Sequence, residues 1–567
     1  IPAATVTVTA SGSANTLSPL SALEPTDSGG KTTVTIKSTK AELKTITAKV
    51  GTTTLPTETV TFVPGPVSAS ESLVSVNPTG GLVANGEATS AITVTARDAY
   101  LNRIPNLDVV LAVSSAGDPA KNTLVQPAEP TDGAGLATGS LTSTWAEEKT
   151  ISATVDGVEL DAKPTITFVP GPVSTETSTV VASPAIDVVA DGVTTSTITI
   201  TVLDVFSNPI PSTAVTLTKS STVPIMTTPA ATKSDGVTTA TIKSIKAETV
   251  TLTAKVGTTP LPTATVTFVP DIPHADKSTV IVSRATGVIA NNLDTSTITA
   301  TIKDANSNLI SGATAAFASS NANDTLTPTS ATSGANGVAT ATIASTKAEL
   351  KTITVTVNGT LVLTAAPKVT FVPGPPSASV STATAPADPV VADGGATSTI
   401  TVTVRDEYAN PISGKAVTLT ATGTGHKFLQ PANSGANGVT TGTINSTVAE
   451  KKTITATIDG TPAVVIAQTP EVTFVPGDIN PASAFTVDRT TGVVANSVDL
   501  VTASVTIKDL KGNPVPGAEV VFAATGTGNT FDPATGTVTT LGDGTASVTL
   551  ASTKAEPRMK TVKRRPW

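Results

Sequence analysis

An aspartate followed four residues later by an asparagine recurs along the chain, and this pair is the first candidate for chemistry. Carboxylate and amide oxygens are the ligands that Ca²⁺ prefers, and the ion takes about six to eight of them. The same aspartates can instead accept backbone N–H groups at a tight turn, which requires no metal. The sequence leaves a calcium site and a hydrogen-bonded turn as alternatives. The aspartates are Asp98, Asp204, Asp304, Asp406 and Asp509.

A calcium bridge at the joints between repeats is less favoured than a turn. Residues 64–66 and 170–172 read Pro-Gly-Pro and carry no carboxylate. The carboxylates near a joint are Asp271, Asp276 and Asp478. Because each proline fixes φ, we expect short, stiff joints that are stabilised by proline and packing, without calcium.

A glutamate recurs after an alanine late in each repeat, with a lysine close by in most repeats. Such a pair resembles an acid–base site, but a charged pair beside a turn is usually solvated. We therefore expect exposed ion pairs that contribute little to stability. The glutamates are Glu42, Glu147, Glu248, Glu349, Glu450 and Glu556, and the lysines are Lys44, Lys149, Lys351 and Lys451.

Residue types for other catalytic or metal sites are scarce. The two histidines, His274 and His426, stand at unrelated positions of the repeat, so neither a triad nor a multi-histidine metal site is expected. Cysteine is absent, which excludes disulfides and thiolate metal ligands. A serine, threonine or paired-carboxylate mechanism needs a base or a cleft that small sandwich cores do not normally provide. We expect no catalytic residue, no cofactor-binding residue, no cofactor and no enzymatic activity.

The elements that position these residues are predicted to be short β-strands. In residues 197–202, Ile and Val alternate with Thr, a period of two that places the two kinds of side chain on opposite faces. The same alternation recurs at residues 399–404, 453–458 and 501–507. Asn-Gly, Asp-Gly and Asn-Pro pairs separate such segments as turn signals. About seven short strands in about 100 residues are typical of a two-sheet Ig-like sandwich.

Three markers recur in the same order about every 100 residues, which indicates tandem repeats. They are the Asp-to-Asn pair, the Ala-Glu pair and the segment Phe-Val-Pro that begins at Phe62, Phe168, Phe268, Phe371 and Phe474. The predicted fold is all-β, a tandem array of Ig-like antiparallel β-sandwich domains forming an elongated rod on the order of 200 Å long. The predicted domains are 65–170, 171–270, 271–373 and 374–476, with a partial repeat at 1–64 lacking its N-terminal strands and another at 477–567 lacking its C-terminal strands.

Composition argues against several classes of protein. Aromatic residues make up 3% of the chain and charged residues 14%, which favours many small cores over one large core. The net charge is −8 and no basic stripe is present, so nucleic-acid binding is not expected. No apolar stretch reaches the length of about 18 residues that crosses a membrane. The basic residues 557–567 depart from the repeat and are interpreted as a truncated or frame-shifted end, with a membrane or nucleic-acid tail as the alternative.

Several segments carry a family resemblance. Val-Ala-Asp-Gly at 189–192 leads into Thr-Ser-Thr-Ile-Thr at 195–199, Gly-Asn-Pro-Val-Pro-Gly stands at 512–517, and Ser-Thr-Lys-Ala stands at 345–348. Together they resemble the bacterial Ig-like domain of group 1, the repeat of the invasin and intimin adhesins of Gram-negative bacteria. Two departures, a Glu where the family usually has Gly after the last Ala and an Asn-Asn pair at 291–292 in place of Asp-Gly, are expected to change a turn and not the fold.

The resemblance implies display on the cell surface, with anchoring in the outer membrane of a Gram-negative bacterium by a part outside this sequence. The implied function is a structural stalk that projects an adhesive tip, which this sequence does not contain. In the alternative, one or more repeats bind a host receptor, a glycan or a neighbouring cell directly. The expected partners are a host-cell or glycan receptor at most, no nucleic acid, and a membrane only through the absent anchor.

Overall fold

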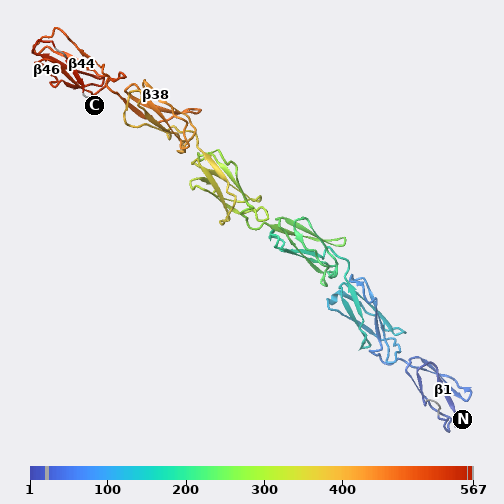
Figure 1. The fold of residues 1–567 in the computed structure, drawn as a ribbon. Helices are drawn as coiled ribbons and strands as arrows, with labels where there is room; N and C mark the ends of the chain where they lie inside the picture. The colour runs from blue at the N-terminus through green and yellow to red at the C-terminus, as the bar shows by residue number, and fades with distance from the viewer. Residues whose placement is uncertain (20–23, 558–559, 565–567) are drawn as a thin grey trace. The chain divides into compact units, whose positions relative to one another are not determined.

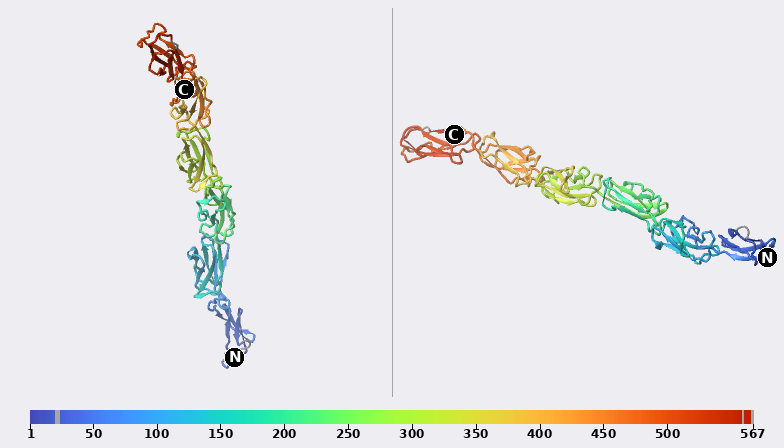
Figure 2. Two further views of the ribbon diagram at one scale, coloured as in Figure 1. Left: turned by 60° about the vertical axis from the view of Figure 1, so that its left-hand side comes forward. Right: turned by 90° about the horizontal axis from the view of Figure 1, so that it is seen from below.

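The structure is a computed structural model that describes residues 1–19, 24–557 and 560–564 (Figure 1). It contains two compact units, residues 1–271 and 272–567. Strands are the main element of both units, and the helix found among the described residues is a single 3-10 turn, η1 (Pro119–Lys121). Within each unit the strands gather into separate bodies, which remain separate in two further views (Figure 2). The predicted all-β fold is confirmed.

The first strands of the unit 1–271 form two small sheets, called the first sheet pair here. One sheet has the order β1-β4-β5 with β6 also paired to β4, and the other consists of β2 and β3. Val6 is the buried apolar side chain among its described residues. The strands are β1 (Val6–Ala10), β2 (Asn15–Ser18), β3 (Thr35–Ser38), β4 (Leu43–Val50), β5 (Thr53–Thr54) and β6 (Glu58–Thr61).

The second sandwich, residues 73–169, has a complete core. Its sheets have the orders β11-β12-β9-β7 and β10-β13-β15-β8, with β14 paired to β13. The Phe-Val-Pro marker supplies β15, whose Phe168 lies opposite Leu82 in a parallel pairing and is buried. The strands are β7 (Leu73–Asn77), β8 (Leu82–Val83), β9 (Ser90–Thr95), β10 (Val109–Ser114), β11 (Asn122–Val125), β12 (Leu136–Ser143), β13 (Glu148–Val155), β14 (Val158–Glu159) and β15 (Thr165–Val169).

The third sandwich, residues 179–269, shows how the alternation builds the core. In β18 the side chains of Ile198 and Ile200 are fully buried, whereas the intervening threonines face outward, which confirms the strand predicted at 197–202. The sheets are β16-β18-β21-β20 and β17-β23-β22-β19. The strands are β16 (Thr179–Ser183), β17 (Val188–Val189), β18 (Ser196–Thr201), β19 (Thr216–Lys219), β20 (Ile225–Met226), β21 (Val237–Lys243), β22 (Thr249–Val256) and β23 (Thr259–Val269).

The unit 272–567 begins with the fourth sandwich, residues 279–372. Its sheets are β24-β26-β30-β28 and β25-β33-β31-β27-β29, with β32 paired to β31. Phe371 again closes the core through a parallel pairing of β33 with β25. The strands are β24 (Thr279–Val282), β25 (Val288–Ile289), β26 (Ser296–Thr301), β27 (Thr314–Ser319), β28 (Thr325–Thr327), β29 (Ser330–Thr332), β30 (Val338–Ala344), β31 (Leu350–Val357), β32 (Leu361–Val362) and β33 (Lys368–Val372).

The fifth sandwich, residues 382–475, repeats this plan. Its sheets are β34-β36-β39-β38 and β35-β42-β40-β37, with β41 paired to β40. The strands are β34 (Thr382–Thr384), β35 (Val390–Val391), β36 (Ser398–Thr403), β37 (Val417–Ala421), β38 (His426–Leu429), β39 (Val439–Ser446), β40 (Lys451–Ile458), β41 (Val464–Val465) and β42 (Glu471–Val475).

The sixth sandwich, residues 484–564, differs from the sequence expectation in its last strand. Residues 557–567 are predicted to leave the repeat, but Lys560–Arg564 form β49 and pair with β45, with Val562 opposite Phe522. The reason is that the segment keeps two β-branched residues, Thr561 and Val562, which favour an extended strand at the edge of that sheet. Residues 558–559 and 565–567 lie outside the described residues. The strands are β43 (Ala484–Val487), β44 (Val501–Thr506), β45 (Glu519–Ala524), β46 (Asn529–Asp532), β47 (Thr537–Thr539), β48 (Thr545–Ser552) and β49 (Lys560–Arg564), in the sheets β43-β44-β48-β46 and β47-β45-β49.

Candidate functional site at the joints between sandwiches

The turn after β9 holds the Asp-to-Asn pair of the second sandwich. Asp98 is 3% exposed. Its Oδ1 accepts the backbone N–H groups of Tyr100 at 2.8 Å and Asn102 at 2.9 Å. Its Oδ2 accepts the N–H of Gly65 at 2.8 Å and the side-chain Nδ2 of Asn102 at 2.7 Å. Because Gly65 lies in the segment that leads in from the first sheet pair, one carboxylate fixes both the turn and the linker.

Asn102 extends this network to the preceding sheets. Its Oδ1 accepts the N–H of Ala41 at 2.8 Å, and its Nδ2 donates to the carbonyl oxygen of Thr39 at 2.9 Å. An aspartate at this position would bring a second carboxylate against Asp98 and has no N–H to donate. An asparagine is therefore required by the contacts. We call the Asp, the Asn, the linker Gly and the two backbone groups of the preceding sheets the Asp–Asn clamp.

The clamp recurs at a second joint of the unit 1–271 and at two joints of the unit 272–567. At these joints the Asn side chain contacts the preceding sandwich at distances between 2.7 and 3.0 Å. The linker Gly donates to the aspartate at 2.8 to 3.0 Å. The clamps consist of Asp204, Asn208, Gly171, Thr144 and Ala146; of Asp406, Asn410, Gly374, Thr346 and Ala348; and of Asp509, Asn513, Gly477, Thr447 and Ala449.

The fifth candidate aspartate, Asp304, forms the same turn. Its Oδ1 accepts the N–H groups of Asn306 and Asn308, and its Oδ2 accepts Nδ2 of Asn308 at 2.8 Å. Asp304 is fully buried. All five candidates thus share one local structure.

Hydrogen bonding lowers the pKa of two clamp aspartates, Asp98 and Asp509. Burial alone would raise the pKa of Asp98, but the hydrogen bonds from Asn102, Gly65 and Tyr100 outweigh it, and the pKa lies below its ordinary value. The pKa of Asp509 is likewise lowered, because the donors of Asn513 and Gly477 outweigh burial. These aspartates are therefore charged at neutral pH while they are buried.

These hydrogen bonds are the ones that the turn interpretation predicts. The carboxylate oxygens of the clamp aspartates face N–H donors, which repel a cation from the same lone pairs. Across the described parts of the chain, no group of three or more acidic or histidine side chains is placed to hold a metal ion. The aspartates act here as acceptors that organise a joint.

The recurrent Ala-Glu marker leads to a correction. The expectation of exposed ion pairs is wrong for the lysine partners, because the side chains of Lys44, Lys149, Lys351 and Lys452 are 0% exposed. Each lysine stands two residues after its glutamate, so strand alternation points it into the sandwich. The glutamates lie at the boundary, partly exposed.

The partner of Glu450 also differs from the expected Lys451. Nζ of Lys452 lies 2.6 Å from Glu450 and donates to the carbonyl oxygen of Thr424 at 2.7 Å. Lys451 faces the other side of β40, where it pairs with Glu471. Adjacent strand residues face opposite sides of a sheet, and the sequence did not show which of the two lysines faces inward.

Charge pairing shifts the pKa values of these groups. Lys44, then the N–H of Ser13 and Lys40, lower the pKa of Glu42 from 4.5 to about 2. Lys351, then Asn321 and Lys347, lower the pKa of Glu349 from 4.5 to about 2.

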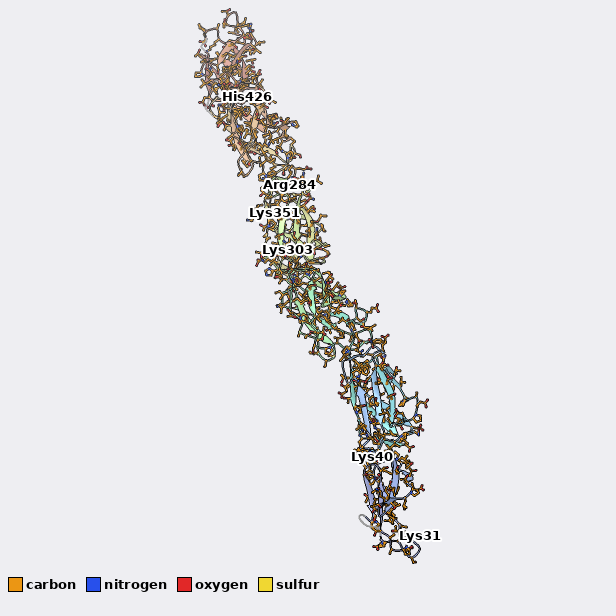
Figure 3. All side chains as sticks on the ribbon, turned by 90° about the vertical axis from the view of Figure 1, so that its right-hand side faces the viewer. Lys31, Lys40, Arg284, Lys303, Lys351 and His426 are labelled. Atoms are coloured by element: carbon orange, nitrogen blue, oxygen red, sulfur yellow. The ribbon has the colours of Figure 1, made fainter. Side chains whose placement is uncertain are left out.

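Lys351 has a second carboxylate partner. Burial works to lower its pKa, but its contacts with Asp324 and Glu349 outweigh burial and raise it. Figure 3 labels Lys351 in the fourth sandwich, at a level between the labels of Arg284 and Lys303.

The role of the clamp asparagines was missed by the sequence reasoning, which considered their amides as Ca²⁺ ligands beside the aspartates but not as contacts to the preceding sandwich. The available signal was the asparagine itself, which recurs at the same spacing although the three residues before it vary. A turn alone does not require an amide side chain at that position. The asparagine side chain contacts backbone groups of the preceding sandwich that lie more than 60 positions away in the sequence. No local sequence pattern reveals such a contact.

Comparison with known proteins places these sandwiches in known families. The model of the bacterial Ig-like domain (group 1) matches residues 177–269, 278–372, 380–475 and 482–563, and that of invasin domain 3 matches residues 68–171. The inverse autotransporter adhesin YeeJ of Escherichia coli (strain K12) is 27% identical over 486 residues, which cover 83% of this chain and 20% of that protein. The chain therefore spans about a fifth of the length of that relative.

Two solved structures are also similar. The Escherichia coli adhesin FdeC is 21% identical with a TM-score of 0.40, covering 55% of this chain and 100% of that one. Invasin, described as a bacterial integrin-binding protein, is 22% identical with a TM-score of 0.39, covering 74% of this chain and 81% of that one. The described residues hold no helix with the length and apolar character needed to span a membrane. Since the matched segments make up more than half of the sequence, the chain belongs to the bacterial Ig-like domain (group 1) family.

Proposed function

We propose that this chain is part of the stalk of a bacterial surface adhesin, a non-catalytic spacer that projects a binding region lying elsewhere in the protein. The observation that carries the proposal is the Asp–Asn clamp, which joins neighbouring sandwiches at four described joints by the same partly buried hydrogen bonds. A joint between independent domains is mobile by default unless a specific interface restrains it. Here the same restraint recurs at two joints of the unit 1–271 and at two joints of the unit 272–567.

The repeated geometry favours an elongated array. Each clamp joins the turn after one strand to the backbone just before the Ala-Glu marker of the preceding sandwich, so each joint uses the same two surfaces. The proposed domains are 1–64, 65–170, 171–270, 271–373, 374–476 and 477–567. A heterologous contact that repeats head to tail produces an open array. We expect a rod on the order of 200 Å long.

Relationship to an inverse autotransporter adhesin supports surface display with anchoring in an outer membrane by another part of the protein. A host receptor or glycan would then contact that other region. The sixth sandwich has a hollow of about 600 Å³ that is lined by apolar residues and by Arg489, Lys554 and Glu556. It lies beside Val493 and Val494, which correspond to the residues that pair with the Phe-Val strand in the fifth sandwich.

Small-angle X-ray scattering of the full chain tests the proposal. The wild type should give the profile of a rod with a maximum dimension on the order of 200 Å. The double variant Asn208→Ala and Asn410→Ala should keep its β content by circular dichroism and give a profile of greater flexibility. A compact wild-type particle would contradict the rod. Retained binding of host cells or glycans by this chain alone would favour the direct-binding alternative.

A further inference from the structure

The interior of the fourth sandwich holds a lysine against two carboxylates. Nζ of Lys351 lies 2.8 Å from Oδ1 of Asp324 and 2.7 Å from Oε1 of Glu349. The side chain of Lys351 is 0% exposed and that of Asp324 is 1% exposed. Oδ1 of Asp324 accepts no well-directed hydrogen bond, so the Nζ contact is a close approach of the two groups. The Ser319 hydroxyl donates to the other oxygen, Oδ2 of Asp324.

The fold places these groups from two different sheets. Lys351 is the second residue of β31, where alternation points it inward, and it lies opposite the fully buried Val369 of β33. Asp324 directly precedes β28, which belongs to the opposite sheet. A covalent bond between them would tie the two sheets of this sandwich together.

Strand register shows that the second carboxylate is particular to the fourth sandwich. Asp324 precedes Thr325, which lies opposite Ala344, so Asp324 is level with Ser345. The residues level with the corresponding serine in other sheets are Asn15, Asn122, His426 and Asn529. In the third sandwich, Pro224 takes this position and Val250 takes that of the lysine.

Among the described residues, one carboxylate lies in contact with each of the other buried lysines. Lys44 and Lys452 donate to backbone carbonyl oxygens, of Ser13 at 2.8 Å and of Thr424 at 2.7 Å. Lys149 pairs with Glu147. These three lysines therefore serve as internal controls for any reaction of a buried lysine that requires an aspartate beside the amine.

We propose that Nζ of Lys351 and Cγ of Asp324 condense into an isopeptide bond, with Glu349 as the positioning and proton-relay group. A proton passes from the ammonium of Lys351 to Oδ1 of Asp324, and the resulting amine attacks Cγ. A second proton passes from nitrogen through Glu349 to the departing hydroxyl. That hydroxyl leaves as water, one C–N bond replaces one C–O bond, and no oxidant or reductant is needed.

Three features of the site promote this step. The fold holds amine and carboxyl in contact, which replaces an encounter by an intramolecular reaction. Burial disfavours the ion pair relative to a neutral amine beside a neutral acid. The Ser319 hydroxyl stands where the negative charge develops on Oδ2 during the attack. Because the two carboxylates favour the protonated lysine, the free amine is scarce and the bond forms slowly, after folding.

Intact-mass spectrometry of the full chain is the test. After prolonged incubation at neutral and at mildly alkaline pH, the wild type should be lighter than its sequence mass by one water molecule. Lys351→Arg should have its full sequence mass. Asp324→Asn should lose one ammonia molecule instead of water, because the amide nitrogen then departs. A wild-type mass equal to the sequence mass after this incubation would overturn the proposal, whatever the variants show.

Peptide mapping of the denatured wild type locates the bond. Trypsin should fail to cleave after Lys351, and the peptides that contain Lys351 and Asp324 should appear as one cross-linked species. Cleavage after Lys149 and Lys452 should be normal. Glu349→Gln should fold, as judged by circular dichroism, and form the cross-link more slowly. Normal cleavage after Lys351, or a cross-link to a residue other than Asp324, would contradict the assignment.

Discussion

The third and fourth sandwiches fill the same buried position with side chains of opposite character, one apolar and one charged. In the fourth, Lys351 is fully buried between Glu349 and Asp324. In the third, the corresponding residue is Val250, also fully buried, and Glu248 turns to the exposed Lys246 at 2.8 Å and to the Ser221 hydroxyl at 2.6 Å. The fold therefore does not require the buried lysine. A buried ion pair is costly to desolvate, and four repeats nevertheless place a buried lysine beside a glutamate at this position.

The largest effect is expected from removing the cation of the fourth sandwich. In the freshly folded chain, before a cross-link has formed, Lys351→Ala leaves Asp324 buried without a counter-charge, which should lower the free energy of unfolding of this sandwich by about 3–5 kcal/mol. Hydrogen exchange of the β30 and β31 amides in the full chain measures that loss. Lys351→Arg, which retains the charge, is the matched control. A loss below about 1 kcal/mol, the range of exposed pairs, would mean that the buried pair contributes no more than a surface pair.

The response to acid should report the pairing of Glu349 with Lys351 in the chain before cross-linking. The folded-state pKa of Glu349, about 2, lies below its ordinary value of 4.5. Its contribution to stability is therefore complete above pH 4.5 and is lost as the pH falls towards 2. The pKa of Glu248 is lowered as well, by Lys246 and then Ser221. Carboxyl NMR titration should find the midpoint of Glu349 near pH 2. A midpoint near 4.5 would show that Glu349 titrates like an unpaired glutamate and would contradict its pairing with Lys351.

The smallest effect is expected when the buried lysine of the fifth sandwich is replaced by valine, the residue that the third sandwich has at this position. Lys452→Val in the fifth sandwich removes a buried cation whose partner, Glu450, is 37% exposed and can turn to water. Replacing a buried charge by a well-packed apolar group is often neutral, so the free energy of unfolding should change by less than about 1 kcal/mol. Hydrogen exchange of the β40 amides reports it, with the outward-facing Lys451→Val as control. A loss as large as that of Lys351→Ala would show that the second carboxylate, Asp324, is not what distinguishes the two sites.

The strands could be predicted from the sequence because the alternation of side chains along a strand depends on neighbouring residues only. The alternation at residues 197–202 fixes which side chains enter the core, and β18 buries Ile198 and Ile200 as expected. The candidate site was harder to predict. The Asp-to-Asn spacing gave the turn, but the reach of Asn208 to Thr144 and Ala146 depends on how successive sandwiches meet.

The lysines illustrate the same limit. Lys451 and Lys452 are adjacent, and only the register of β40 decides that Lys452 faces inward. Asp324 reaches Lys351 from the opposite sheet, across 27 positions of sequence. Contacts of this kind are set by tertiary packing and leave no pattern in the composition or in the spacing of neighbouring residues.

Amide hydrogen exchange at Ala146 most directly tests whether the Asp–Asn clamp holds the joints at which it is found. Its N–H donates to Oδ1 of Asn208 at 2.7 Å across the joint. A fastened joint predicts strong protection of this amide in the wild-type chain and its loss in Asn208→Ala, while the amides of β18 stay protected. Exchange of the Ala146 amide in the wild type as fast as in the variant would show that the clamp is open in solution, and would contradict the account.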